Sequence, residues 1–347
     1  MPYSDLPPKA FWSRCRATPG FAIGDLFTPK FPVTTGTQIA TAGSCFAQNI
    51  GKYLAVSDLH LVDTEPAPGP MPQTIAAQHG YGLFSARFGN IYIARQLFQL
   101  VQDAMTGTVH DCAIWTKAGR SVDALRPNVE PTGFSSAQEL IAHRRDHLAR
   151  VRQMFGQAEV FIFTLGLTET WAHRATGVVF PSAPGVIAGT YDPTQHVFSN
   201  AGFGDTLKDL QAAITLMRQI NPDLRIILTV SPVPLTATAS GQHVLAATTY
   251  SKAVLRAVAG ELATSDPLID YFPSYEIITG TPFKSQFFDT NLRSVTKDGV
   301  AAVMATFFAA YGHATPIIVP RIPQGDPDDG TDDTICEEAM IESLTRP

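Results

Sequence analysis

The sequence has few cysteines and no long apolar run, and these two absences exclude several classes of protein. Only four of its 347 residues are cysteine (Cys15, Cys45, Cys112 and Cys336), which is too few for a disulfide framework, and their spacing is not that of a metal site. No segment approaches the roughly 18 apolar residues of a membrane span, and residues 1–16 show no apolar stretch behind a basic start. We therefore expect a cytoplasmic protein with reduced thiols and no membrane contact.

Charged side chains are also scarce, and their distribution is uneven. They make up 16% of the chain, with a net charge of −6. Residues 324–347 hold one arginine and eight acidic residues, namely Asp326, Asp328, Asp329, Asp332, Asp333, Glu337, Glu338 and Glu342. That segment carries −7, so the rest of the chain is near +1 (−6 minus −7) and offers no basic field for nucleic acid. We expect residues 321–347 to form an acidic, largely flexible tail that is a candidate contact for a protein partner.

Short apolar runs alternate with helical patterns from residue 38 onward. Runs at 38–43, 160–165, 224–230 and 268–272 predict buried parallel strands, with a further edge strand at 59–63. Between them, helices are predicted over 45–56, 91–105, 135–156, 204–220, 248–264 and 296–312. This alternation predicts a three-layer α/β/α protein with a doubly wound parallel sheet.

The same pattern predicts three regions in the chain. Residues 1–37 form an N-terminal arm that packs on the body, and residues 38–320 form the α/β domain. Insertions are expected at 57–134, which includes a long loop at 107–134, and at 172–203, an irregular stretch that would cover the site as a lid.

Ser44 is the candidate nucleophile. It follows the strand at 38–43 and precedes a helical pattern, so Gly43 would make the turn and the Ser44 hydroxyl would stand beside free helical N–H groups. Such a site favours an oxyanion. A serine before a helix is also a common N-cap, and this alternative stays open. The enzymatic interpretation requires the hydroxyl to open onto a cleft.

Four motifs resemble those of one known family. They are Gly43-Ser44-Cys45-Phe46-Ala47, the stretch from Phe163 to Trp171, the stretch from Thr229 to Leu235, and the stretch from Tyr271 to Ile277. Together and in this order they resemble the GSCFA family, which is similar to the SGNH (GDSL-like) hydrolases. The resemblance implies a flavodoxin-like fold and ester chemistry at Ser44, without a defined substrate.

The resemblance also implies where the other site residues lie. Gly82 or Gly89 would supply an N–H to the oxyanion, and Asn90 would donate from its side chain. In the later motif, Gly166 and Thr168 occupy the places where SGNH enzymes carry a glycine and an oxyanion-binding asparagine. Glu169 would hold Thr168 or Ser44 by a hydrogen bond. Trp171 is either an aromatic platform for a sugar or acyl group or a core residue.

The expected general base is missing from its usual place. SGNH enzymes carry an Asp-x-x-His block after the last strand, and here Asp289 is followed three residues later by Leu292 and then by Arg293. We expect His243 to act as the base and Asp289 to orient it, with His79 or His173 as alternatives. Arg293 would bind an anionic substrate or pair with Asp289.

These expectations lead to a serine-dependent acyl esterase or O-acyltransferase, with an acylated carbohydrate as the substrate class that the superfamily suggests. The alternative is a binding protein that kept the pocket and lost the base. No cofactor is expected. No metal is expected either, because His143 and His147 share a helix face but have only Glu139, eight residues from His147, to complete a site.

Overall fold

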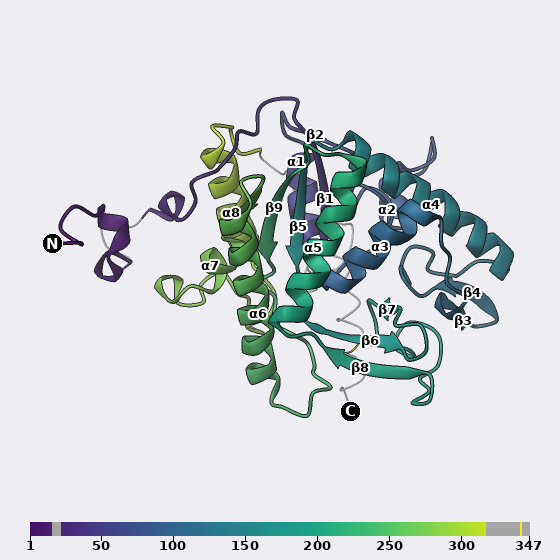
Figure 1. Ribbon diagram of the computed structural model, residues 1–347. Coiled ribbons are helices and arrows are strands. Elements are labelled where there is room, and N and C mark those ends of the chain that lie inside the picture. The colour runs from purple at the N-terminus through teal and green to yellow at the C-terminus, as the bar shows by residue number, and fades with distance from the viewer. Residues whose placement is uncertain (16–21, 317–340, 342–347) are drawn as a thin grey trace.

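The structure is a computed structural model that describes residues 1–15, 22–316 and 341 of the chain (Figure 1). Its centre is a five-stranded sheet in the order β10-β9-β5-β1-β2, and every pairing in it is parallel. The strands are β1 (Gln38–Gly43), β2 (His60–Leu61), β5 (Val160–Leu165), β9 (Arg225–Val230) and β10 (Ile269–Tyr271). The predicted α/β class and the edge strand near residue 60 are confirmed.

Helices cover both faces of this sheet and complete the three layers (Figure 1). One face packs against α3 (Ala94–Thr106), α4 (Ala137–Gln157), α5 (Phe203–Ile220) and α6 (Val244–Ser265). The other face packs against α1 (Ala47–Leu54), α7 (Ser274–Thr279) and α8 (Lys297–Ala310). The short helix α2 (Gln73–Gln78) lies in the segment after β2.

Strand β5 shows why the sequence forms these layers. All six of its residues are buried, as a strand with helices on both sides requires. Phe161 and Phe163 point into the core on the α3–α6 side, whereas Val160 and Ile162 point into the core on the α1–α8 side. Successive side chains of a strand alternate between its faces, so one apolar run supplies both cores.

Two smaller sheets lie outside the central one. Strand β6 (Glu169–His173) pairs in antiparallel fashion with β7 (Val179–Phe180) and β8 (His196–Asn200), and β3 (Ile114–Lys117) pairs with β4 (Arg120–Asp123). The prediction that 172–203 is irregular was therefore wrong, as was the prediction of a plain loop at 107–134. In Figure 1 the β6–β8 sheet lies beyond the carboxyl ends of β5 and β9.

The N-terminal residues divide into an outlying part and a packed part. Residues 1–14 are exposed and stand away from the body in Figure 1, whereas Phe27, Phe31 and Val33 are buried in the core beside α8. The ammonium of Lys30 donates to backbone carbonyls at the end of α6 and the start of β10, including Ile269 O at 2.8 Å.

Short 3₁₀ helices lie at Pro8–Ala10, Trp12–Arg14, Ile23–Leu26, Asp111–Ala113 and Thr281–Phe283. The predicted acidic tail lies outside the described residues except for Ile341.

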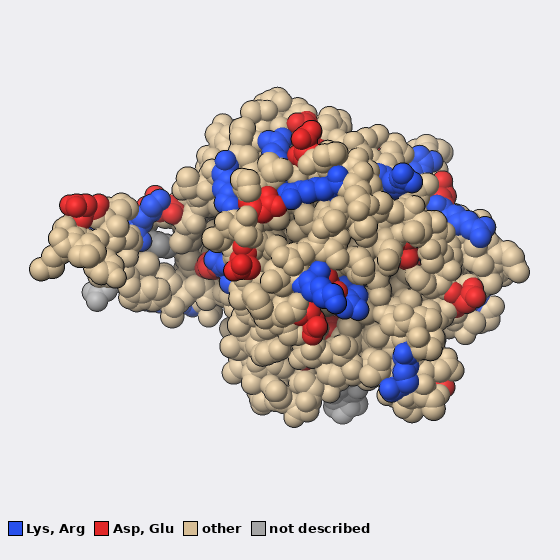
Figure 2. All heavy atoms as spheres, in the orientation of Figure 1, with Lys and Arg blue, Asp and Glu red and all other residues tan. Residues whose placement is uncertain are grey.

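Figure 2 shows that lysines and arginines are scattered over the visible face, with acidic residues beside several of them and no continuous basic patch. None of the helices within the described ranges is both long enough and apolar enough to cross a bilayer.

Candidate functional site

The carboxyl ends of three neighbouring strands converge on one small cavity. Ser44 directly follows β1, Gly166 follows β5 and Ser231 follows β9, and all three residues line it. The cavity measures about 10 Å³, which is close to the space that one water molecule needs. Its remaining lining residues are Cys45, Tyr92, Leu167, Val233, Pro234, Leu235 and Lys252. The site therefore lies at the sheet edge where open α/β folds bind ligands.

Gly43 makes the turn that brings Ser44 to this edge. Its φ is +143°, and a Cβ atom there would lie 2.5 Å from the carbonyl oxygen of Thr164, so a larger residue does not fit. The Ser44 N–H donates to the same Thr164 oxygen at 3.1 Å and extends the β1–β5 ladder by one residue. Helix α1 begins only at Ala47. The helix thus begins two residues later than predicted, and Ser44 lies in the turn that leads into it, where its carbonyl accepts the Ala47 N–H at 2.8 Å. The Ser44 N–H itself is engaged with Thr164 and is not a free helical N–H.

The Ser44 hydroxyl is closed off from solvent. The residue is 2% exposed, and its Oγ has no hydrogen-bond partner among the described residues. The open cleft that the sequence interpretation required is therefore absent at this serine in the described structure. Burying a hydroxyl group without a hydrogen-bond partner costs folding free energy, so such a group calls for an explanation other than stability.

Gly166 lies directly against Ser44. A Cβ atom on Gly166 would come within 3.1 Å of the Ser44 Cβ and 3.0 Å of the Tyr92 ring. The N–H groups of Gly166 and Leu167 both donate to the Tyr92 carbonyl, at 2.9 and 3.1 Å. The predicted site residue Gly166 is thus placed beside the serine, and its lack of a side chain permits the contact.

Lys252 enters the same cavity from α6. The residue is 2% exposed, and its side-chain nitrogen Nζ lies 2.6 Å from the Gly166 carbonyl oxygen, to which it donates. The sequence interpretation overlooked this lysine. A signal was present, because Lys252 precedes the buried Leu255 and Ala259 by three and seven residues and so falls on the inward stripe of the helix.

A larger pocket adjoins the cavity. It measures about 240 Å³, and three of its lining residues (Tyr92, Leu167 and Leu235) also line the Ser44 cavity. Most of its wall is apolar. Ile93, which precedes α3, contributes to it, and the β6–β8 sheet and its connections contribute Trp171, Phe180, Pro181, Ala183, Val186 and Phe198. Ile341 also lines it. The predicted platform Trp171 faces this pocket, and its ring contacts those of Tyr191 and Phe198 edge-on.

A model of the GSCFA family matches residues 38–307, which is 270 residues of the chain (307 − 38 + 1). The chain belongs to the GSCFA family. No curated protein is similar enough to count as a relative. The matched region begins at the first residue of β1 and ends within α8, so it contains every residue that lines the Ser44 cavity of this GSCFA protein.

The predicted base and its partner lie elsewhere. His243 is exposed and caps α6, where its Nδ1 accepts the Leu245 N–H at 3.2 Å. Asp289 is exposed, and its carboxylate accepts the N–H of Thr290. Within the described residues, neither side chain hydrogen-bonds to the other or to Ser44, and neither lines the two cavities. The helix starts four residues earlier than predicted, which makes His243 a cap instead of a loop residue.

Asn90 is buried near the Ser44 turn, but it lines neither of the two cavities that the described residues form. Ile91 N–H donates to the Gly43 carbonyl at 2.8 Å, so Asn90 is buried one residue from the Ser44 turn, where its Oδ1 accepts from Gln48 at 3.1 Å. Gly82 is exposed in a turn with φ +68° and lines neither cavity among the residues described.

The remaining predicted residues have other partners. The Thr168 hydroxyl donates to Asn200 Oδ1 at 2.7 Å, and this hydrogen bond connects the loop after β5 to strand β8. Glu169 faces the larger pocket and accepts a hydrogen bond from the Thr238 hydroxyl at 2.6 Å, so it holds neither Thr168 nor Ser44. Arg293 is half-buried in the loop after Asp289, and its backbone N–H donates to Asn291 Oδ1 at 2.9 Å.

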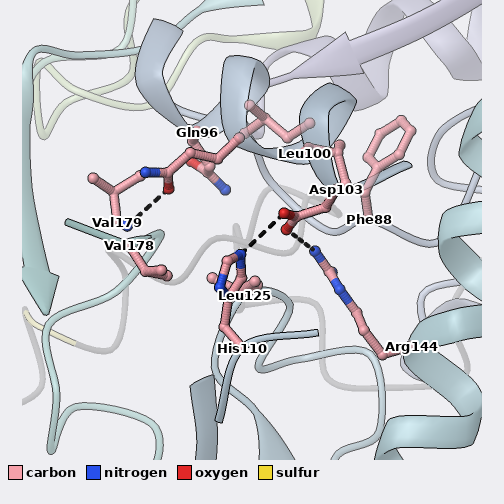
Figure 3. Close-up of a pocket in the computed structure, with 11 residues that line it drawn as sticks. Phe88, Gln96, Leu100, Asp103, His110, Leu125, Arg144, Val178 and Val179 are labelled. Carbon is pink, nitrogen blue, oxygen red and sulfur yellow. Dashed lines mark hydrogen bonds and ion pairs between the residues drawn. The ribbon is translucent and has the colours of Figure 1, made fainter. Parts of the chain in front are cut away.

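A separate group of buried charges fastens the segment 107–134 to α3 and α4. Figure 3 shows Asp103 between His110 and Arg144, and the distances are 3.0 and 3.6 Å. Asp123 accepts from Arg126 at 2.7 Å and lies 3.8 Å from Arg144. The cavity beside these groups measures only about 20 Å³. Because each buried arginine has a carboxylate beside it, the group is a structural anchor.

His147 belongs to this anchor. Its Nδ1 lies 2.8 Å from Glu65, and burial lowers the pKa of His147 to about 4. Burial alone would raise the pKa of Glu65, but its hydrogen bond with His147 and the positive charge of Arg126 lower that pKa to about 2. His147 is thus neutral and Glu65 ionised at neutral pH. Within the described ranges, no three histidine, cysteine or acidic residues are grouped so that they could hold a metal ion.

Proposed function

We propose that this protein is a serine-dependent acyl esterase or O-acyltransferase with Ser44 as its nucleophile. The observation that carries the proposal is the buried, unpartnered Ser44 hydroxyl in a cavity that shares three lining residues with a large apolar pocket. An acyl chain in that pocket would bring its ester carbonyl toward Ser44. Because no cleft opens onto Ser44 in the described structure, the proposal requires Leu167 and Leu235, which line both cavities, to move aside and admit the ester.

The proposed reaction has two halves. Ser44 Oγ bonds to the ester carbonyl carbon, its proton passes to a base, and the alcohol leaves with a proton as the acyl-serine forms. Water then takes the acyl group in an esterase, or a second alcohol takes it in a transferase. Asn90, whose neighbour Ile91 donates to the Gly43 carbonyl, is the candidate donor to the oxyanion, and its side chain would have to turn toward the cavity, which it does not line in the described structure.

The larger pocket supports an acylated carbohydrate as the substrate class. Trp171 supplies an aromatic ring that could stack on a sugar, and Glu169 and Thr238, which are hydrogen-bonded to each other, line the same pocket and have polar groups that could bind sugar hydroxyls. The apolar remainder of the wall suits the acyl chain.

The test is labelling of the full chain with a fluorophosphonate, together with hydrolysis of p-nitrophenyl butyrate. We expect wild-type protein to be labelled and Ser44→Ala to lose both labelling and turnover. Ser231→Ala is the matched control, because Ser231 is equally buried in the same cavity and its hydroxyl accepts the Val233 N–H at 3.3 Å. Labelling of Ser44→Ala at the wild-type rate would overturn the proposal.

The second candidate is a binding protein without turnover. It is favoured by one observation, that His243 and Asp289 lie outside the Ser44 cavity. In that case wild-type protein stays unlabelled by the fluorophosphonate, while a fatty-acyl sugar raises its melting temperature.

A further inference from the structure

We propose that Lys252 is the base that takes the proton from Ser44, in place of the histidine of related hydrolases. The inference rests on the proposed function and names the residue that completes its chemistry. Among the described residues that line the Ser44 cavity, Lys252 is the one with a side-chain nitrogen.

The first support is position. Gly166 connects the two side chains, since its carbonyl oxygen accepts from Lys252 at 2.6 Å and its Cα lies against Ser44. Lys252 and Ser44 are each 2% exposed and face the same space of about 10 Å³. Because Ser44 Oγ has no direct hydrogen-bond partner among the described residues, the proton passes through a single water molecule, for which the cavity has room.

The second support is the anchoring of the amine. A base in a nucleophile–base pair is usually oriented by a third group. Here the Gly166 carbonyl plays that part, because it accepts an N–H from the Lys252 side chain and so fixes the position of the nitrogen. Lys252 also lies one residue after Ser251, whose hydroxyl accepts the Thr168 N–H at 3.0 Å, so the helix is pinned to the loop at this point.

The third support is environment. A lysine acts as a base only when its amine is neutral, and removal from water favours the neutral form over the ammonium. Leu167, Val233, Pro234 and Leu235 contribute apolar lining to the cavity that Lys252 enters.

The proton balance is complete without a further reactant. The neutral amine takes the Ser44 proton as Oγ bonds to the carbonyl carbon, and the resulting ammonium gives that proton to the departing alkoxide. In the second half the amine takes a proton from water or from the acceptor alcohol, and it returns that proton to Ser44 Oγ when the acyl bond breaks.

The test compares wild type, Lys252→Met and Lys252→Arg for the rate of Ser44 labelling by a fluorophosphonate between pH 6 and pH 10. We expect both variants to lose at least 100-fold in rate and to lose the pH dependence of the wild type. Lys208→Met is the control, because Lys208 is exposed on α5 and belongs to neither cavity. Circular dichroism and thermal melting establish that each variant is folded.

A rescue experiment separates a base from a structural lysine. Lys252→Ala leaves space beside Gly166, and we expect ethylamine to restore labelling while tetramethylammonium, which has no lone pair, does not. If the variants fail to fold, the wild-type profile decides alone, and a rate that is flat from pH 6 to pH 10 overturns the inference.

The possible failures are distinguishable. Labelling of Ser44 that is equally fast in wild type and Lys252→Met overturns the role of Lys252 and leaves the serine nucleophile intact. Absence of labelling in wild type, or labelling that survives Ser44→Ala, overturns the proposed function and this inference with it.

Discussion

Gly166 and Ser44 approach so closely that a methyl group on Gly166 would lie 3.1 Å from the Ser44 Cβ. The same methyl group would lie 3.0 Å from the Tyr92 ring. Both residues that it meets line the Ser44 cavity, so the contact fixes the shape of the site.

Gly166→Ala is therefore expected to disturb both stability and reactivity. The added methyl group has to push Ser44 or Tyr92 aside, which costs about 1–3 kcal/mol in the free energy of unfolding and moves the hydroxyl. Urea denaturation and the fluorophosphonate labelling rate measure the two effects. Gly204→Ala is the control, because nothing lies within 4 Å of a Cβ there and alanine favours helix α5. A Gly166→Ala protein with wild-type stability and labelling would show that the contact is not restrictive.

The His147–Glu65 pair predicts a loss of stability in acid. The folded protein holds the pKa of His147 near 4, below its ordinary 6.5, so between these values the unfolded chain binds a proton that the folded protein does not. The free energy of unfolding therefore falls as the pH drops from about 6.5 to about 4, by roughly 3 kcal/mol for this group. The pKa of Glu65 is lowered from 4.5 to about 2 in the folded protein, so the free energy of unfolding falls further as the pH drops below 4.5.

Urea midpoints measured from pH 7.5 to pH 4 test this expectation. His147→Asn keeps an N–H toward Glu65 but does not titrate, so its stability is expected to change less between pH 6.5 and pH 4.5. His143→Asn is the control on the same helix, where His143 is exposed. Parallel curves for wild type and His147→Asn would contradict the assignment.

Ala183→Phe is expected to shorten the acyl chain that the protein accepts. Ala183 lines the larger pocket and is half-buried, so a phenyl ring at this position occupies space that a long chain needs. We expect kcat/KM for p-nitrophenyl octanoate to fall at least tenfold, with less than a threefold change for the acetate. Ala175→Phe, in the exposed turn between β6 and β7, should leave both values unchanged. Equal losses for the two esters would mean that the acyl chain lies elsewhere.

The sequence predicted the central layers well because their signal is local. Strand β5 was predicted with the observed bounds, since its continuous apolar run has one structural solution between two helical layers. Helices α5 and α8 were likewise placed within one or two residues. The position of Ser44 and Gly166 at one sheet edge followed from the parallel order of β1 and β5.

The short outer strands gave no such signal. Strand β7 has two residues, and its pairing with β6 depends on contacts between segments that have no periodicity of their own. The larger pocket is built on these strands, so its shape was not predictable from local sequence patterns.

Lys252 and His243 show the same limit at the level of single side chains. A lysine in a helical pattern is normally assigned to the solvent face, and only the register of the buried stripe in α6 places Lys252 inside. His243 was assigned to a loop at the catalytic edge. Because helix α6 begins one turn earlier than predicted, His243 caps its N-terminus instead, about 13 Å along the helix axis from Lys252.

Cys45 gives this site an internal reporter. Its thiol is 6% exposed and lines the Ser44 cavity, whereas Cys15 and Cys112 are half-exposed. The rate at which a small alkylating reagent modifies Cys45 therefore reports how often the side chains of Leu167 and Leu235 move apart, and the measurement needs no substrate.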